Sequence, residues 1–150
     1  MTTPPAPFLT FDVTIAAPTS FGDSGEGSRR VIPITGGTVS GEHTGRVLPF
    51  GADWQSVLPD GTIELSAHYG LELDDGARIE VTSIGLRAAT PQIMAALGRG
   101  ETVDPDTYYF RTHMRLRTGH PAHAHLNKQL YTGRGARAAA GVRVQVFRVP

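Results

Sequence analysis

Apolar and polar residues alternate along most of this chain, in short segments separated by glycine and proline. The clearest alternation covers residues 62–73, and Asp75-Gly76 then leads into a second alternating segment over residues 77–84. A period of two residues predicts strands with one buried face, and Asp-Gly favours the tight turn of a hairpin. The same pattern predicts further strands over residues 11–15, 29–35, 108–116, 124–132 and 142–149.

One short helix interrupts the strands. Thr90 is suited to be its N-cap, Pro91 to be its first residue and Gly98 to end it. We expect this helix to act as a lid or plug. Residues 18–28 are expected to form a flexible loop, and the glycine-rich residues 133–141 to form a hairpin connection, because they lack the Gly-Lys-Ser/Thr ending of a phosphate loop.

About eight strands and one short helix in 150 residues predict an all-β fold, a single antiparallel β-barrel. Closure removes the exposed edges that an open antiparallel sheet leaves. We expect one domain over residues 1–150, with residues 1–7 as a flexible N-terminus. An eight-stranded barrel has room inside for one small ligand.

Composition narrows the possible partners. The chain has no cysteine, which removes disulfides and thiolate chemistry, and no apolar segment of membrane-spanning length. From residue 107 onward there are eight Lys and Arg and no Asp or Glu, but the whole chain has a net charge of zero. We therefore expect strands of opposite charge to lie side by side. We also expect a cytoplasmic protein that has no nucleic-acid or membrane partners. Whether it forms a homodimer or a higher homo-oligomer stays open.

Histidine is the most distinctive side chain, because four of the six lie within residues 113–125. Strand alternation would place side chains of the same parity on one face. The three polar faces predicted in this way are His123, His125, Asn127, Gln129 and Tyr131; Arg111, His113 and Arg115; and Ser66, His68 and Gly70. Each of these faces is either solvated or lines a polar cavity.

The spacing His123-x-His125 allows two imidazoles to reach one metal ion, as in a cupin barrel. A catalytic site needs a third ligand, for which His113 and His68 are candidates. However, Gln129 stands where the cupin pattern has a carboxylate. We therefore favour acid–base chemistry that needs no cofactor, with His123 and His125 as the weak metal alternative.

Several ordered motifs resemble one known family. They are Gly36-Gly37-Thr38-Val39-Ser40-Gly41, Gly51-Ala52-Asp53-Trp54-Gln55, Pro59-Asp60-Gly61-Thr62, Asp75-Gly76-Ala77-Arg78-Ile79, Gly85-Leu86-Arg87, Tyr108-Tyr109-Phe110-Arg111-Thr112 and Leu126-Asn127. Together they resemble DUF3237, also called UPF0311, from about residue 8 to residue 149. The resemblance implies a small antiparallel barrel, similar to calycin or allene-oxide-cyclase-like barrels, with no agreed activity.

The departures from the family pattern fall on histidines. His68 stands where the family usually has arginine, and His125 where it usually has tryptophan. The segment Leu116-Arg117-Thr118 replaces the family's Phe-Glu-Thr. These differences indicate either a specialised pocket or neutral drift.

We therefore expect a pocket that binds a small, partly apolar, carbonyl-bearing metabolite and catalyses isomerase, cyclase or lyase chemistry. A proton-transfer group near neutrality and donors for a developing oxyanion are what such chemistry needs. The candidate catalytic residues are Asp53, His125, His68, Arg111, Asn127 and Tyr69. The candidate ligand-binding residues are Trp54, Tyr108, Phe110 and His113. A non-catalytic lipocalin-like binding protein and an accessory partner in a larger complex are the alternatives.

Overall fold

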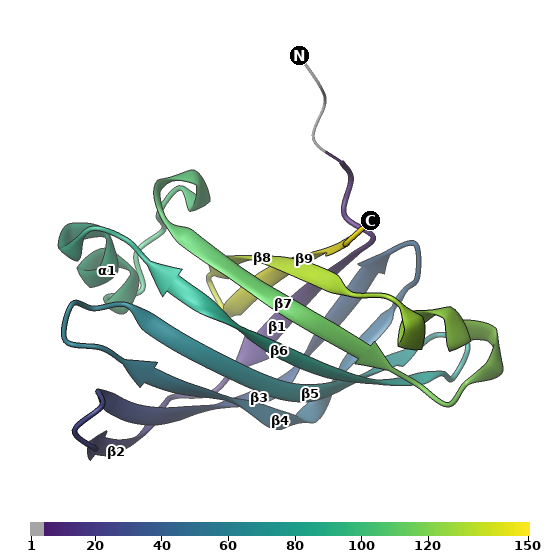
Figure 1. Cartoon of the computed structure of the whole chain (residues 1–150), viewed down its shortest axis with the longest axis horizontal. Helices are drawn as coiled ribbons and strands as arrows, with labels where there is room; N and C mark the ends of the chain where they lie inside the picture. The colour runs from purple at the N-terminus through teal and green to yellow at the C-terminus, as the bar shows by residue number, and fades with distance from the viewer. Residues whose placement is uncertain (1–4) are drawn as a thin grey trace.

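The computed structural model describes residues 5–150 and contains nine antiparallel strands, eight of which close into a barrel (Figure 1). The strands are β1 (Leu9–Ile15), β2 (Thr19–Asp23), β3 (Ser28–Gly41), β4 (Gly45–Val57), β5 (Ile63–Leu73), β6 (Arg78–Ala88), β7 (Tyr109–Arg117), β8 (Tyr131–Ala138) and β9 (Gly141–Arg148). The helical segments are α1 (Pro91–Gly98), η1 (Pro105–Thr107) and η2 (Pro121–Lys128). The predicted all-β barrel with one short helix is confirmed. Part of the expected flexible segment 1–7 lies outside the described residues.

Strand β1 closes the barrel by pairing on both sides. Phe11 lies opposite Val144 of β9 and opposite Val39 in the second half of β3. The first half of β3 pairs instead with β2, the strand outside the closed ring. The expected loop over residues 18–28 is therefore wrong in part. All five residues of β2 are exposed, so no buried alternation marks this strand in the sequence.

The barrel is packed solid at one end. Phe11, Leu71 and Leu116 are fully buried in one hydrophobic core, and the rings of Phe8 and Tyr131 stack at a centroid distance of 5.7 Å. Segment η2 covers this end and contributes the buried Leu126. Figure 1 shows η2 and α1 at opposite ends of the barrel.

Helix α1 forms as the sequence predicts. The Thr90 hydroxyl accepts a hydrogen bond from the Ile93 N–H at 3.3 Å, and Pro91 occupies the first helical position. Leu97 is buried in a second, smaller apolar cluster with Leu65 and Phe110. The helix therefore packs against the end of the barrel away from η2.

The expected strand over residues 124–132 is wrong in its first half. Residues 121–128 form η2, and β8 begins only at Tyr131. The Asn127 side chain accepts from the Thr118 N–H and donates to the Thr118 carbonyl, both at 2.8 Å, which holds this segment folded back on the end of β7. The strand parity assigned to His123, His125 and Asn127 consequently does not apply.

The expected hairpin connection over residues 133–141 is also wrong in part. Most of it is strand β8, and the turn is confined to Ala139 and Ala140. A Cβ atom on Gly135 would lie 2.6 Å from the ring of Phe110. The glycine is needed in the strand because the aromatic ring of β7 occupies its side-chain space.

Ion pairs link the acidic and basic halves of the chain. Arg143 of β9 binds Asp12 of the adjacent β1 at 2.8 Å, and Arg148 binds Glu42 at 2.7 Å. The structure therefore confirms that the opposite charges face one another. Within residues 5–150, no helix has the length and hydropathy needed to cross a bilayer.

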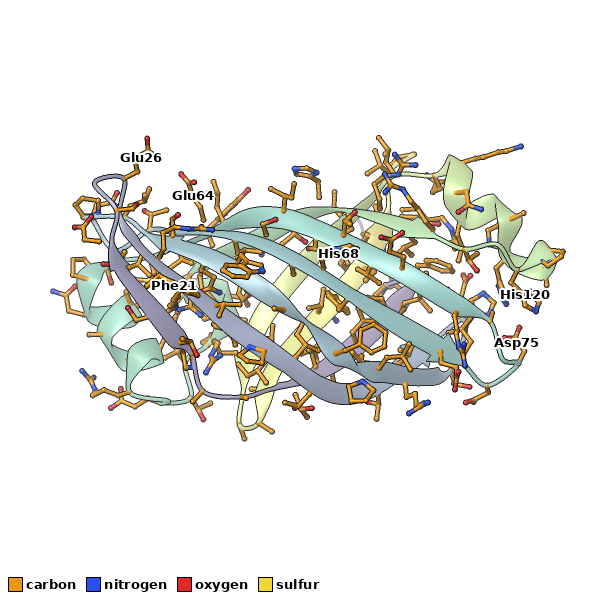
Figure 2. All side chains as sticks on the ribbon, turned by 90° about the horizontal axis from the view of Figure 1, so that it is seen from below. Phe21, Glu26, Glu64, His68, Asp75 and His120 are labelled. Atoms are coloured by element: carbon orange, nitrogen blue, oxygen red, sulfur yellow. The ribbon has the colours of Figure 1, made fainter. Side chains whose placement is uncertain are left out.

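A histidine cluster sits at the packed end. The rings of His43 and His123 meet edge to face at 4.7 Å, and the buried His123 places Nε2 2.6 Å from Asp75 Oδ2. His120 and His125 flank His123. Figure 2 shows Asp75 and His120 together at this end, with His68 farther along the barrel wall.

We predict that Leu71→Ala lowers the free energy of unfolding by about 2–5 kcal/mol, because it opens a cavity in the solid end of the core. Leu71 is 0% exposed, and the control, Leu130→Ala, changes a leucine that is 57% exposed. Urea denaturation of both variants measures the difference. Equal losses in the two variants would contradict this packing.

We predict that the protein loses stability on mild acidification and that His43→Gln reduces the loss. Burial and the charge of His123 lower the pKa of His43, aided by His125 and opposed by Glu42 and Asp75. Below the ordinary histidine pKa of about 6.5, the unfolded state therefore binds more protons at this position, and stability falls with pH.

Urea denaturation midpoints between pH 8 and pH 5 measure the effect. The control, His113→Gln, removes a histidine from the exposed face of β7 and keeps the wild-type loss. An unchanged pH dependence in His43→Gln would show that this cluster does not set acid sensitivity.

Candidate functional site

The end of the barrel beneath α1 contains a cavity of about 580 Å³. All eight strands of the closed ring contribute to its wall. The main lining residues are Ile15, Arg30, Ile32, Asp53, Gln55, Ile63, Leu65, Arg87, Phe110, Arg137 and Val142 from the strands, with Met94 and Leu97 from α1. The barrel interior is therefore open at the α1 end and filled with side chains at the η2 end.

Asp53 is the carboxylate of this cavity. A bulge in β4 separates the pair Val47 and Leu71 from the pair Gly51 and Tyr69, and Asp53 follows directly after it, facing inward. Gln55 Nε2 donates to Asp53 Oδ2 at 2.7 Å. Oδ1 is shielded from solvent and has no hydrogen-bond partner among residues 5–150. Gln55 therefore holds one carboxylate oxygen, while the other has no hydrogen bond of ordinary geometry, although the backbone N–H of Ser66 lies close enough to favour the ionised carboxylate.

Burial raises the pKa of Asp53 above its ordinary value. The hydrogen bond from Gln55, the backbone N–H of Ser66 and the charges of Arg30 and Arg87 act in the opposite direction without overcoming burial. Arg30 Nε donates to Gln55 Oε1 at 2.8 Å, which fixes the amide so that its NH₂ group faces Asp53. The three side chains form one oriented relay on β3 and β4.

Two more arginines complete the polar part of the wall. Arg87 comes from β6 and Arg137 from β8. Arg87 is largely buried, and its Nε has no hydrogen-bond partner within residues 5–150. Burial, with the charges of Arg137 and Arg30, lowers the pKa of Arg87 to about 10, so this guanidinium stays protonated at neutral pH.

Tyr69 and Phe110 line the deeper part of the site. A smaller void of about 60 Å³ continues inward from Asp53 past these two aromatic residues. Burial and the charge of Asp53 raise the pKa of Tyr69, so its hydroxyl remains protonated. Tyr108 supports this wall, because its hydroxyl accepts a hydrogen bond from the Arg137 N–H at 3.0 Å. Four sequence-predicted residues, namely Asp53, Tyr69, Phe110 and Tyr108, are thus brought together.

The other predicted catalytic residues do not join them. His68 faces outward and lies 2.6 Å from Glu80, because its neighbours Ala67 and Tyr69 take the inward positions of β5. His125 is exposed on η2 at the opposite end of the barrel. Asn127 is occupied by its two hydrogen bonds to Thr118. The geometry places these three residues outside the cavity.

Arg111, Trp54 and His113 also lie on the outer wall. They line an open groove across the outer faces of β4 to β7, where Arg111 lies over the ring of Tyr109. Trp54 is 43% exposed and stacks on Phe21 of β2. Strand alternation explains the arrangement, because their neighbours Asp53, Phe110 and Thr112 face the interior.

His123 and His125 lie with their ring centroids 6.3 Å apart. Within residues 5–150, no group of three or more His, Asp or Glu side chains is arranged to hold a metal ion. The buried Nε2 of His123 is already paired with Asp75. These side chains form part of the cluster at the packed end and lie apart from the cavity.

The cavity residues missed by the sequence reasoning are Gln55, Arg30, Arg87 and Arg137. A signal existed for Gln55, because it shares strand parity with Asp53 in the same motif. Arg87 belongs to the motif Gly85-Leu86-Arg87, which by itself indicates no chemical role. Arg137 lies in the segment expected to be a hairpin connection, because the glycines of β8 give no strand pattern. Nothing local distinguishes Arg30 from the outward Arg29.

Comparisons with known proteins match the whole barrel. A family model described as "Protein of unknown function (DUF3237)" matches residues 5–149. A UPF0311 protein from Rhodopseudomonas palustris is 46% identical over 142 residues, which cover 94% of this chain and 93% of that protein. A conserved protein of unknown function from the same organism has a crystal structure with a TM-score of 0.90 and 42% identity, covering 99% of this chain and 100% of that one.

Two further structures share the fold. A beta-barrel like protein from Acinetobacter baumannii has a TM-score of 0.83 and 35% identity, with 99% of each chain covered. An enzyme from Penicillium herquei has a TM-score of 0.66 and 20% identity, covering 98% of this chain and 100% of that one. The fungal likeness is one of fold alone. The family model and the bacterial relatives span nearly the full chain, and the protein therefore belongs to the DUF3237 family.

Proposed function

We propose that this protein is a cofactor-independent acid–base enzyme that acts on a small, partly apolar, carbonyl-bearing metabolite in the barrel cavity. The observation that carries the proposal is the free, buried Oδ1 of Asp53 on the cavity wall. A carboxylate with a raised pKa and a vacant oxygen is a stronger proton acceptor than an ordinary surface aspartate.

The proposed step is proton transfer at the carbon next to a carbonyl group. Asp53 takes the proton, and the electron pair of the broken C–H bond moves to the carbonyl oxygen, which becomes an enolate. Arg87 and Arg137 stabilise this negative oxygen, because guanidinium donors already placed in the cavity wall need little reorganisation as charge develops. Return of the proton to another carbon completes an isomerisation, and loss of a leaving group completes a lyase reaction.

The relay from Arg30 through Gln55 gives Asp53 a fixed orientation. Because Gln55 occupies Oδ2, we assign proton acceptance to Oδ1. Tyr69, protonated and adjacent to the deeper void, can donate a hydrogen bond to a bound carbonyl group. The fungal neighbour described as an enzyme adds that this fold supports catalysis elsewhere.

A ligand-binding protein without catalysis is the second candidate. The apolar side chains around the cavity, such as Leu65, Phe110 and Val142, favour it, because they would bind an apolar ligand with or without a reaction. The two candidates differ in what Asp53 does. A binding protein needs no vacant carboxylate oxygen.

We predict that Asp53 titrates above the ordinary aspartate pKa, and that Gln55→Leu raises the pKa further, because Gln55 stabilises the ionised form. The ¹³C chemical shift of the labelled Asp53 carboxyl measures the midpoint. The control is Ser56→Ala, which changes the next residue on the outer face. A midpoint at or below 3.9, or no rise in Gln55→Leu, would contradict the described environment.

We predict that the protein exchanges α-protons of small carbonyl compounds with D₂O, and that Asp53→Asn slows this exchange by about 100-fold or more. Proton NMR of a panel of ketones and keto acids measures the exchange. Glu64→Gln on the exposed face of β5 is the control and keeps the wild-type rate. If the wild type accelerates exchange of no compound, or if Asp53→Asn is as active as wild type, the catalytic proposal is wrong.

A further inference from the structure

Three arginines converge on the cavity from strands that are far apart around the barrel. Arg30 belongs to β3, Arg87 to β6 and Arg137 to β8. Asp53 supplies the single carboxylate among the lining residues that the structure describes. Three positive charges against one negative charge give this wall an excess of two positive charges.

Six arginines outside the cavity form ion pairs, whereas Arg29, Arg111, Arg115 and Arg117 form none within residues 5–150. Arg46, Arg143 and Arg148 each bind a carboxylate on a neighbouring strand or turn. None of the three cavity arginines forms such a pair within residues 5–150. Charge that is withdrawn from water without a partner raises the free energy of the folded protein. What distinguishes Arg30, Arg87 and Arg137 from the other unpaired arginines is that they converge on one cavity.

The arginines are also close enough to disfavour one another's charge. The positive charges of Arg137 and Arg30 act on Arg87, and that of Arg137 acts on Arg30. The buried Arg87 Nε remains an unused donor in the described part of the chain. An anion placed among the three guanidinium groups would remove this repulsion and fill the vacant donor.

The rest of the cavity is apolar. Leu65, Phe110 and Val142 lie below the arginines, and Met94 and Leu97 of α1 cover the same space. This lining would exclude a small hydrated ion such as free phosphate from most of the volume. It matches a molecule with a hydrophobic body and one charged end.

We infer that the cavity binds an amphipathic organic anion, whose charged group lies among Arg30, Arg87 and Arg137 and whose apolar body packs against Leu65, Phe110 and Val142. The inference rests on the proposed function in taking the cavity as the working site, and it adds the charge class of the substrate. Three guanidinium groups exceed what one enolate oxygen requires. The substrate therefore carries a negative charge of its own before any proton is moved.

A matched pair of dyes tests the charge class directly. The anionic probe is 8-anilinonaphthalene-1-sulfonate, and the neutral probe is N-phenyl-1-naphthylamine, which has the same ring system without the sulfonate. Fluorescence titration of the wild type is expected to show at least about tenfold tighter binding of the anionic dye, the size of one charge-assisted hydrogen bond.

Variants locate the binding. Arg87→Met is expected to weaken the anionic dye by about tenfold and to leave the neutral dye unchanged. Arg87→Lys keeps the positive charge and is expected to retain part of the preference for the anionic dye. It provides the test if the methionine variant does not fold. Arg117→Met removes an exposed arginine from the outer face of β7 and is expected to change neither affinity. Val142→Trp fills the apolar cavity and should weaken both dyes.

The outcomes separate this inference from the proposed catalysis. Equal affinity for the two dyes, or equal effects of Arg87→Met and Arg117→Met, overturns the anionic class and leaves the cavity as a neutral-ligand site. If neither dye binds, the cavity is not a binding site and both proposals are wrong. If the anionic preference depends on Arg87 but Asp53→Asn does not alter proton exchange, the ligand class stands and the catalysis fails.

Discussion

Pairing of β1 with both β3 and β9 is the constraint on which the rest of this structure depends. A single strand of seven residues turns an open sheet into a closed ring, and closure gives the molecule an inside. Inward side chains then have two possible environments, a filled core or a cavity. Closure also places β1 beside β9, so that Asp12 of the acidic half of the chain pairs with Arg143 of the basic half.

The two ends of the barrel use this interior differently. At the η2 end, large apolar side chains such as Leu71 and Leu116 fill the space and stabilise the fold. At the α1 end, Asp53 and three arginines replace part of that packing, which costs stability because charged groups are poorly accommodated away from water. The stability gained by packing at the η2 end offsets the cost of the polar cluster at the α1 end. Polar clusters that lower stability in this way are often found at functional sites.

The barrel itself follows from local sequence patterns, whereas half of the candidate site does not. Alternation in β5 predicts the strand, the turn after it and the placement of His68 and Tyr69 on opposite faces, without reference to any other segment. Thr90, Pro91 and Gly98 likewise predict α1. The motif around Asp53 indicates a site residue correctly, whereas His68 and His125 are indicated only by their residue type. A titratable side chain indicates a functional site only when the fold places it in a pocket. In this barrel both histidines lie on the outer surface.

The sequence by itself determined most of the strands, the short helix and which side chains of β5 and β7 share a face, because these depend on neighbours in the chain. Only the tertiary structure decided which face is the inside of the barrel and which residues meet there. Arg30, Gln55, Arg87 and Arg137 come from segments separated by up to about a hundred residues, and strand pairing around a closed ring brings them together. No local sequence pattern predicts that these side chains lie close together, because their proximity depends on the register of every strand between them.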